Sequence, residues 1–103
     1  MQPRDTCLTI VLPRSLEENL VDHLLQHPEL VTGFTTTQVE GHGHAVPLRG
    51  TSEEVRGRAR RIQVQIVLNG ADAKTLVEHL KAALPNPEVA YWMLPVLDFG
   101  RFA

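Results

Sequence analysis

Two histidines near the middle of the chain have a spacing that suits metal binding. His42 and His44 lie two residues apart in the segment Gly41-His42-Gly43-His44. If an extended strand continues through them, both imidazoles leave the same face of that strand and can bind Cu²⁺, Zn²⁺ or Ni²⁺. Two histidines are fewer than the four ligands of a structural zinc site, and the sequence has no Cys-x-x-Cys. The alternative interpretation is a polar, Gly-rich turn.

Arginines gather in the same part of the chain. Residues 41–61 contain five arginines and two glutamates, a net charge of +3, whereas the other five basic and ten acidic residues sum to −5. Guanidinium groups present forked N–H donors to phosphate, carboxylate or bicarbonate. We therefore predict an anion-binding site formed by Gly41, His42, Gly43, His44, Arg58, Arg60, Arg61 and Arg101. A solvated surface loop is the alternative interpretation.

Other residue types give weaker indications of chemistry. His23 and His27 lie four apart, which permits chelation on one face of a helix, but a pair exposed to solvent is the simpler interpretation. No Ser, His and Asp arrangement, phosphate-loop motif or carboxylate pair that would support catalysis is present. We therefore expect a binding protein and not an enzyme.

Length and composition predict one small globular domain over residues 1–103. The chain is 43% hydrophobic and 21% charged, close to the average for globular proteins. Its longest apolar runs, at 7–12 and 89–94, are far shorter than the roughly 20 residues that span a membrane. Residues 1–6 carry no visible export signal. We expect a cytoplasmic protein that does not insert into membranes, with its single Cys7 acting as a small buried hydrophobe.

The first half of the chain predicts two strands and a helix. Alternating apolar residues at 7–12 predict a strand that ends at Pro13. Ser15 and Glu18 have the spacing of a capping box, which predicts a helix extending to about Pro28. Its apolar stripe contains Leu16, Leu20, Val21, Leu24 and Leu25. Residues 33–40 predict a second strand.

The second half begins with a segment that lacks regular periodicity. We predict a long loop at 41–60, and loops of this length are usually functional or disordered. Residues 61–68 predict a third strand, and Asp72 is the predicted cap of a second helix. The apolar stripe of that helix contains Ala73, Leu76, Val77, Leu80, Ala83 and Leu84. A last strand at 89–94 and a tail at 95–103 follow.

This order predicts an α+β, ferredoxin-like βαββαβ fold, with a four-stranded antiparallel sheet and two helices on one face. The helices can cover only that face. The opposite face carries a mixture of polar and apolar side chains from Thr9, Val11, Gln63, Gln65, Val67 and Trp92. Oligomerisation through the uncovered face would remove its apolar surface from water.

The chain resembles the PII-like superfamily of small trimeric signalling proteins. The resemblance rests on the split fold, on Gly33-Phe34-Thr35-Thr36-Thr37-Gln38-Val39-Glu40-Gly41-His42-Gly43, and on the arginine-rich loop between strands two and three. His42-Gly43-His44, the segment 52–58, Tyr91-Trp92 and Asp98-Phe99-Gly100-Arg101 are similar to an uncharacterised proteobacterial PII-like family often found beside heavy-metal efflux genes. The segment 41–60 corresponds to the T-loop of this superfamily.

The resemblance implies a homotrimer that binds a small ligand, an adenine nucleotide or bicarbonate, in clefts between subunits. It also implies that the T-loop engages a partner such as a membrane transporter, an efflux protein or an enzyme. Nucleotide-binding PII proteins hold phosphates with a Gly- and Lys-containing turn before the last strand. This chain has Pro85-Asn86-Pro87-Glu88 there, which removes two N–H donors and adds a carboxylate.

Two functional hypotheses follow, and a third is disfavoured. The first is a trimeric regulator that binds a small anion or nucleotide near 41–44 and 58–61. The second is a metal-binding accessory or sensor of a heavy-metal efflux system that uses His42 and His44. Nucleic-acid binding is disfavoured because the chain outside the arginine-rich segment is acidic and would repel a phosphate backbone.

Overall fold

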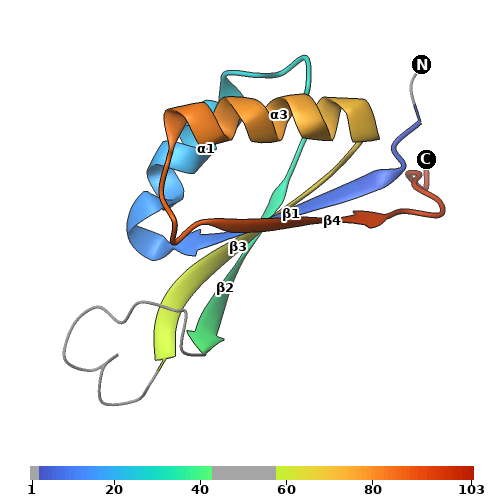
Figure 1. The fold of residues 1–103 in the computed structure, drawn as a ribbon. Helices are drawn as coiled ribbons and strands as arrows, with labels where there is room; N and C mark the ends of the chain where they lie inside the picture. The colour runs from blue at the N-terminus through green and yellow to red at the C-terminus, as the bar shows by residue number, and fades with distance from the viewer. Residues whose placement is uncertain (1–2, 43–57) are drawn as a thin grey trace.

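Alternating apolar residues build one antiparallel sheet that is covered by helices on a single face (Figure 1). The computed structural model describes residues 3–42 and 58–103. The sheet order is β2-β3-β1-β4. The elements are β1 (Thr6–Pro13), the 3₁₀-helix η1 (Arg14–Leu16), α1 (Glu17–Leu25), β2 (Thr35–His42), β3 (Arg58–Leu68), α3 (Gly70–Ala83) and β4 (Ala90–Pro95). The predicted ferredoxin-like α+β fold is confirmed.

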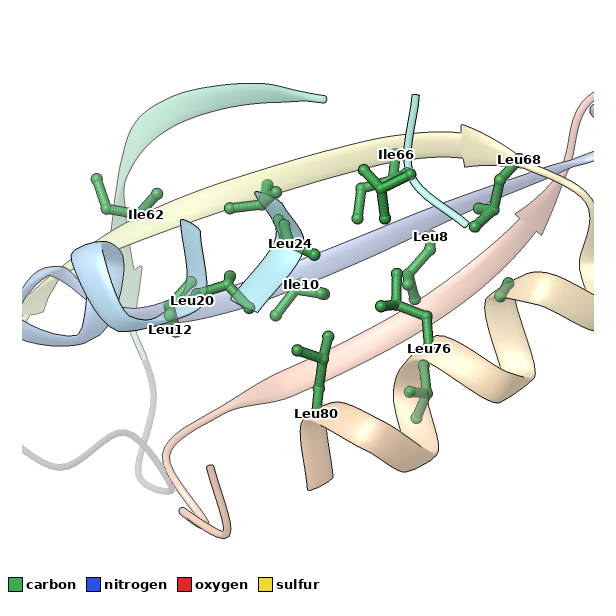
Figure 2. Close-up of a cluster of buried hydrophobic side chains, with 14 residues drawn as sticks. Leu8, Ile10, Leu12, Leu20, Leu24, Ile62, Ile66, Leu68, Leu76 and Leu80 are labelled. Atoms are coloured by element: carbon green, nitrogen blue, oxygen red, sulfur yellow. The ribbon is translucent and has the colours of Figure 1, made fainter. Parts of the chain in front are cut away.

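The core lies between the helices and the two central strands (Figure 2). Register pairs Leu8 with Ile66 and Ile10 with Val64, so these side chains share the face that the helices cover. Leu20 and Leu24 of α1 and Leu76 of α3 are almost completely buried against them. In the described part of the chain, no helix has the length and apolar character needed to cross a membrane.

The start of the first helix differs from the prediction. Ser15 lies within η1, and no side chain caps α1, whose N-cap residue is Leu16. The capping box is therefore wrong. Glu17 and Glu18 instead occupy the first turn of α1, where negative charge interacts favourably with the helix dipole. Leu25 was expected in the apolar stripe but is 66% exposed, because the buried face of α1 follows Leu20 and Leu24 and the next residue points about 100° away from it.

The second helix, α3, begins at Gly70, directly after its cap residue Asn69, which follows the end of β3. The Asn69 side chain accepts hydrogen bonds from the backbone N–H groups of Ala71 (2.9 Å) and Asp72 (3.2 Å), so the predicted cap at Asp72 is wrong. Gly70 N donates to Asp5 Oδ1 at 3.0 Å, and a Cβ at Gly70 would lie 3.1 Å from Thr6 Oγ1. A glycine at this position therefore lets the helix start close to the first strand.

The C-terminal tail returns to the N-terminal end of β1. Val96 N donates to Asp5 O at 2.9 Å, and the Arg4 guanidinium lies 4.7 Å from the ring centroid of Phe99. Figure 1 shows the C-terminal tail and the segment that leads into β1 at the same end of the sheet. The tail is therefore held at the end of the sheet opposite to the end where His42 closes β2 and Arg58 opens β3.

Candidate functional site

β2 and β3 extend beyond the rest of the sheet as a two-stranded arm (Figure 1). β1 ends where Pro13 pairs with Arg61, whereas β3 begins at Arg58 and pairs with β2 alone before Arg61. The extension, which we call the β2–β3 arm, consists of Glu40–His42 and Arg58–Arg60. Paired strand thus replaces both ends of the predicted loop, and residues 43–57 lie outside the described residues.

One face of the β2–β3 arm combines an acidic, a basic and an imidazole side chain. Glu40 pairs with Arg60, and residues directly opposite in a sheet share a face. Glu40 and His42 lie two residues apart on that same face, with Glu40 Oε2 3.9 Å from His42 Nε2. Their side chains are 49% and 64% exposed. A small anion from solvent can reach this face, where the Glu40 carboxylate competes with it for cations.

Arg61 occupies the other face of the sheet. It pairs with Val39 and with Pro13, so its side chain alternates with those of Arg60 and Ile62. Only 4% of Arg61 is exposed, and its Nη1 donates to the carbonyl oxygen of Arg60 at 3.4 Å. The predicted cluster of arginines is therefore divided between the two faces, with Arg60 exposed and Arg61 buried.

The remaining predicted site residues are not all within the described structure. Gly43 and His44 lie outside it, and the side chain of Arg58 is also not described, although its backbone pairs with His42. Gly41 pairs with Ala59 in the middle of the β2–β3 arm. The structure thus brings Gly41, His42 and Arg60 together, while a chelating pair of His42 and His44 stays a prediction.

Arg101 lies far from the β2–β3 arm within one subunit. β4 ends where Pro95 pairs with Thr6, which also pairs with Leu68 at the last residue of β3. The seven residue-to-residue steps from Arg61 to Leu68 span about 23 Å of extended strand. Arg101 follows this far end, so its side chain does not reach the β2–β3 arm of the same chain.

The second predicted histidine pair contacts a different helix. The ring of His27 stacks on that of His79, with centroids 5.0 Å apart, and His27 Nδ1 lies 3.2 Å from Glu29 Oε1. His27, in the loop after α1, therefore contacts His79 of α3 and not His23. Within residues 3–42 and 58–103, no group of three or more metal-ligating side chains is present.

The turn before β4 uses its backbone donors internally. Asn86 N donates to Leu84 O at 2.8 Å, Val89 N to Asn86 O at 3.1 Å, and Glu88 N to Asn86 Oδ1 at 2.8 Å. The two prolines of the turn have no N–H group. All backbone N–H groups of residues 85–89 are thus accounted for, which leaves none to hold a phosphate.

The sheet face without helices combines apolar and polar side chains. Register places Val67, Cys7 and Leu94 in one row and Gln65, Thr9 and Trp92 in the next. Trp92 and Leu94 are 44% and 54% exposed. We call Cys7, Val11, Val67, Trp92 and Leu94 the apolar sheet face. Its position agrees with the alternation seen in the sequence.

Comparison with known protein families assigns the chain to one of them. A family model described as "Protein of unknown function (DUF3240)" matches residues 2–103. The chain belongs to this family. A search of the curated proteins gives no match to the sequence.

Solved structures share the fold of this DUF3240 chain. A DUF3240 family protein from Shewanella baltica has 17% identity and a TM-score of 0.77, with 97% of this chain and 98% of that chain covered. A putative PII-like signalling protein from Thermus thermophilus has 21% identity and a TM-score of 0.63, with 93% and 91% covered. CPII, a nitrogen regulatory PII-like protein from Thiomonas intermedia bound to ADP, AMP and bicarbonate, has 17% identity and a TM-score of 0.70, with 94% and 93% covered. The predicted resemblance to the PII-like superfamily is confirmed at the level of fold.

One residue of the site was missed by the sequence interpretation. Glu40 was assigned only to a strand, yet it lies opposite Arg60 and beside His42. Alternation along 38–42 is the signal that could have placed Glu40 and His42 on one face. The cross-strand pairing with Arg60 depends on register, which the sequence leaves open when the intervening segment is long.

Proposed function

We propose that this protein is a small PII-like regulatory protein. In this proposal it forms a cytoplasmic homotrimer, binds a small anion at the seams between subunits and controls a partner protein through residues 43–57. The shared fold supports this proposal, because two of the similar structures are described as PII-like signalling or regulatory proteins. A transporter or efflux protein is the proposed partner, and the protein acts by binding and not by catalysis.

The observation that carries the proposal is the apolar sheet face. Trp92 and Leu94 together expose a large hydrophobic surface beside the half-buried Val11 and Val67. Exposed large apolar side chains that gather on one face mark an interaction site in soluble proteins. Three copies that turn this face toward a common axis would bury it with the same residues from each copy, as closed symmetry requires.

The proposed anion site lies on the exposed face of the β2–β3 arm. Arg60 supplies a guanidinium and His42 an imidazole that is cationic when protonated. In each subunit the tail that carries Arg101 lies at the opposite end of the sheet from the arm. The Arg101 that completes the site therefore comes from a neighbouring subunit. The ligand displaces the Glu40 carboxylate from these cations, so binding and a change in the arm are coupled.

Bicarbonate is the ligand that this site favours. It carries one negative charge and needs only two or three donors, which the β2–β3 arm can supply. A nucleotide with several phosphates needs more donors, and the turn at 85–89 has none free. CPII is bound to ADP, AMP and bicarbonate, so the adenine nucleotides are the second set of ligands to be tested.

Isothermal titration calorimetry of the full chain with bicarbonate, AMP, ADP and ATP tests the proposal. Arg60→Gln should weaken bicarbonate binding about 10- to 100-fold, because a hydrogen bond to a charged group contributes about 1.5–3 kcal/mol. Glu40→Gln should strengthen it, because the competing carboxylate is gone. Lys74→Gln on α3 removes one positive charge elsewhere and should leave affinity unchanged. Absence of bicarbonate binding, or equal affinity in Arg60→Gln and Lys74→Gln, would contradict the site.

A metal-binding accessory or sensor role is the second candidate. The observation that favours it is the pairing of His42 Nε2 with Glu40 Oε2 at 3.9 Å, which adds a carboxylate to the predicted histidine ligands. Titration with Zn²⁺, Cu²⁺ and Ni²⁺ distinguishes the two functions. A His42→Ala and His44→Ala double variant with unchanged metal affinity would reject the metal function.

A further inference from the structure

An apolar cavity of about 390 Å³ lies on the helix-covered side of the sheet, and none of the described residues that line it belongs to the β2–β3 arm. Its floor consists of Ile10, Leu12, Leu20, Val77 and Leu80, none of which is more than 9% exposed. Figure 2 shows the labelled members of this group pointing toward one another between the sheet and the two helices. The volume falls within the range of about 300–1,000 Å³ that is common for small-molecule sites.

The wall of the cavity is rigid and also apolar. The turn from Leu84 to Val89 forms this wall, with Pro85 and Pro87 both lining the space. Two backbone hydrogen bonds of Asn86, and a third that its side-chain Oδ1 accepts from Glu88 N, hold the turn in place. A preformed apolar space binds an apolar body without the cost of ordering a loop.

A single cation lies at the rim. Lys81 lines the cavity, and its Nζ is 5.1 Å from the ring centroid of Tyr91, which also lines it. This cation–π contact holds the ammonium group beside the opening. Among the described residues that line the cavity, none is acidic. The rim therefore matches one negative charge attached to an apolar body.

We propose that this cavity binds a small amphipathic carboxylate, with its hydrocarbon part on the apolar floor and its carboxylate at Lys81. The site is distinct from the proposed anion site, because the described residues that line it lie on β1, α1, α3, β4 and the turn before β4, whereas Arg60 and His42 lie on the β2–β3 arm. The ligand of this cavity is therefore a medium-chain or aromatic carboxylic acid and not bicarbonate.

Titration of the full chain with octanoate and with octan-1-ol tests the inference. We expect octanoate to bind about three- to fivefold more tightly than the alcohol, which is the range for a partly exposed ion pair. Lys81→Met should lower octanoate affinity to that of the alcohol. Lys74→Met is the matched control, because Lys74 and Lys81 are the only lysines and both lie on α3. It should leave the ratio unchanged.

Val89→Phe fills the cavity and should lower the affinity for both probes more than about tenfold. Lys81→Met changes only an exposed side chain, so its result stands even if Val89→Phe does not fold. Three results would overturn the inference: no octanoate binding, equal octanoate affinity in wild type and Lys81→Met, or unchanged binding in a folded Val89→Phe. Amide shifts at Val77 and Leu84 on octanoate addition would place the ligand in the cavity.

Discussion

Replacing Trp92 with Ala removes the largest side chain of the apolar sheet face. Trp92 is 44% exposed, which corresponds to about 110 Å² of accessible surface for a side chain of about 250 Å². If the homotrimer buries this area, each subunit loses about 2.8 kcal/mol at about 25 cal/mol per Å². The change amounts to about 8 kcal/mol per trimer.

The expected result is a large shift in the concentration at which the trimer dissociates. Because three protomers assemble in one equilibrium, about 8 kcal/mol raises the half-dissociation concentration about a thousandfold. Sedimentation velocity over a dilution series measures this shift. Tyr91→Ala is a closely matched control, because Tyr91 is the neighbouring residue and is 43% exposed but points to the helix-covered side.

The reasoning would be refuted by either of two results. A wild-type protein that sediments as a protomer at all concentrations would show that the apolar sheet face is not an interface between copies. A Trp92→Ala protein that dissociates at the same concentration as Tyr91→Ala would show that assembly uses another surface.

Three further changes test the fold itself. Asn69→Ala should lower the free energy of unfolding by about 1 kcal/mol, because two N–H groups of α3 lose their acceptor; denaturant unfolding with no loss would contradict the cap. Leu76→Ala, at a fully buried position, should cost about 3 kcal/mol, whereas Leu97→Ala, at a fully exposed one, should not change stability in the same assay. The Glu29 pKa lies below its ordinary value of 4.5, first through a backbone hydrogen bond and then through His27, so its contribution to stability is present above pH 4.5 and is lost as the pH falls through the lowered value. Glu29→Gln should therefore lose stability near neutral pH and match wild type in acid, and a difference that is independent of pH would contradict this assignment.

Periodicity was sufficient to predict the architecture. The period of two in 7–12 and 61–68 and the helical stripe around Leu76 define which side of each element is buried. These patterns determine the sheet and the two helices because burial of apolar area dominates the energy of folding. Element order then restricts the topology to the ferredoxin-like arrangement.

The helix starts were harder to predict because they depend on contacts between distant residues. Asn69 and Asp72 both have side chains that can cap a helix, and they lie almost one turn apart. The contact of Gly70 with Asp5 joins residues 65 positions apart, which no local pattern reveals. It places the first turn of α3 directly after β3, and so selects Asn69.

The candidate site was predicted as a single group of residues, and strand geometry divides it. Arg60 and Arg61 are adjacent in the chain, but the pleat of β3 sends them to opposite faces. Arg101 was predicted to belong to the same anion site, and the pairing of Pro95 with Thr6 places the tail that carries it at the far end of the sheet. Which residues meet at a seam between subunits depends on assembly, which a single chain does not encode locally.

The most direct test of the account is a crystal structure of the protein grown with bicarbonate. The account predicts three copies around a threefold axis, with Trp92 and Leu94 of each copy buried against the others. It also predicts an anion beside Arg60 and His42 of one subunit and Arg101 of the next. An apolar sheet face left open to solvent, or an arm whose Glu40 still contacts His42 with no anion bound, would contradict it.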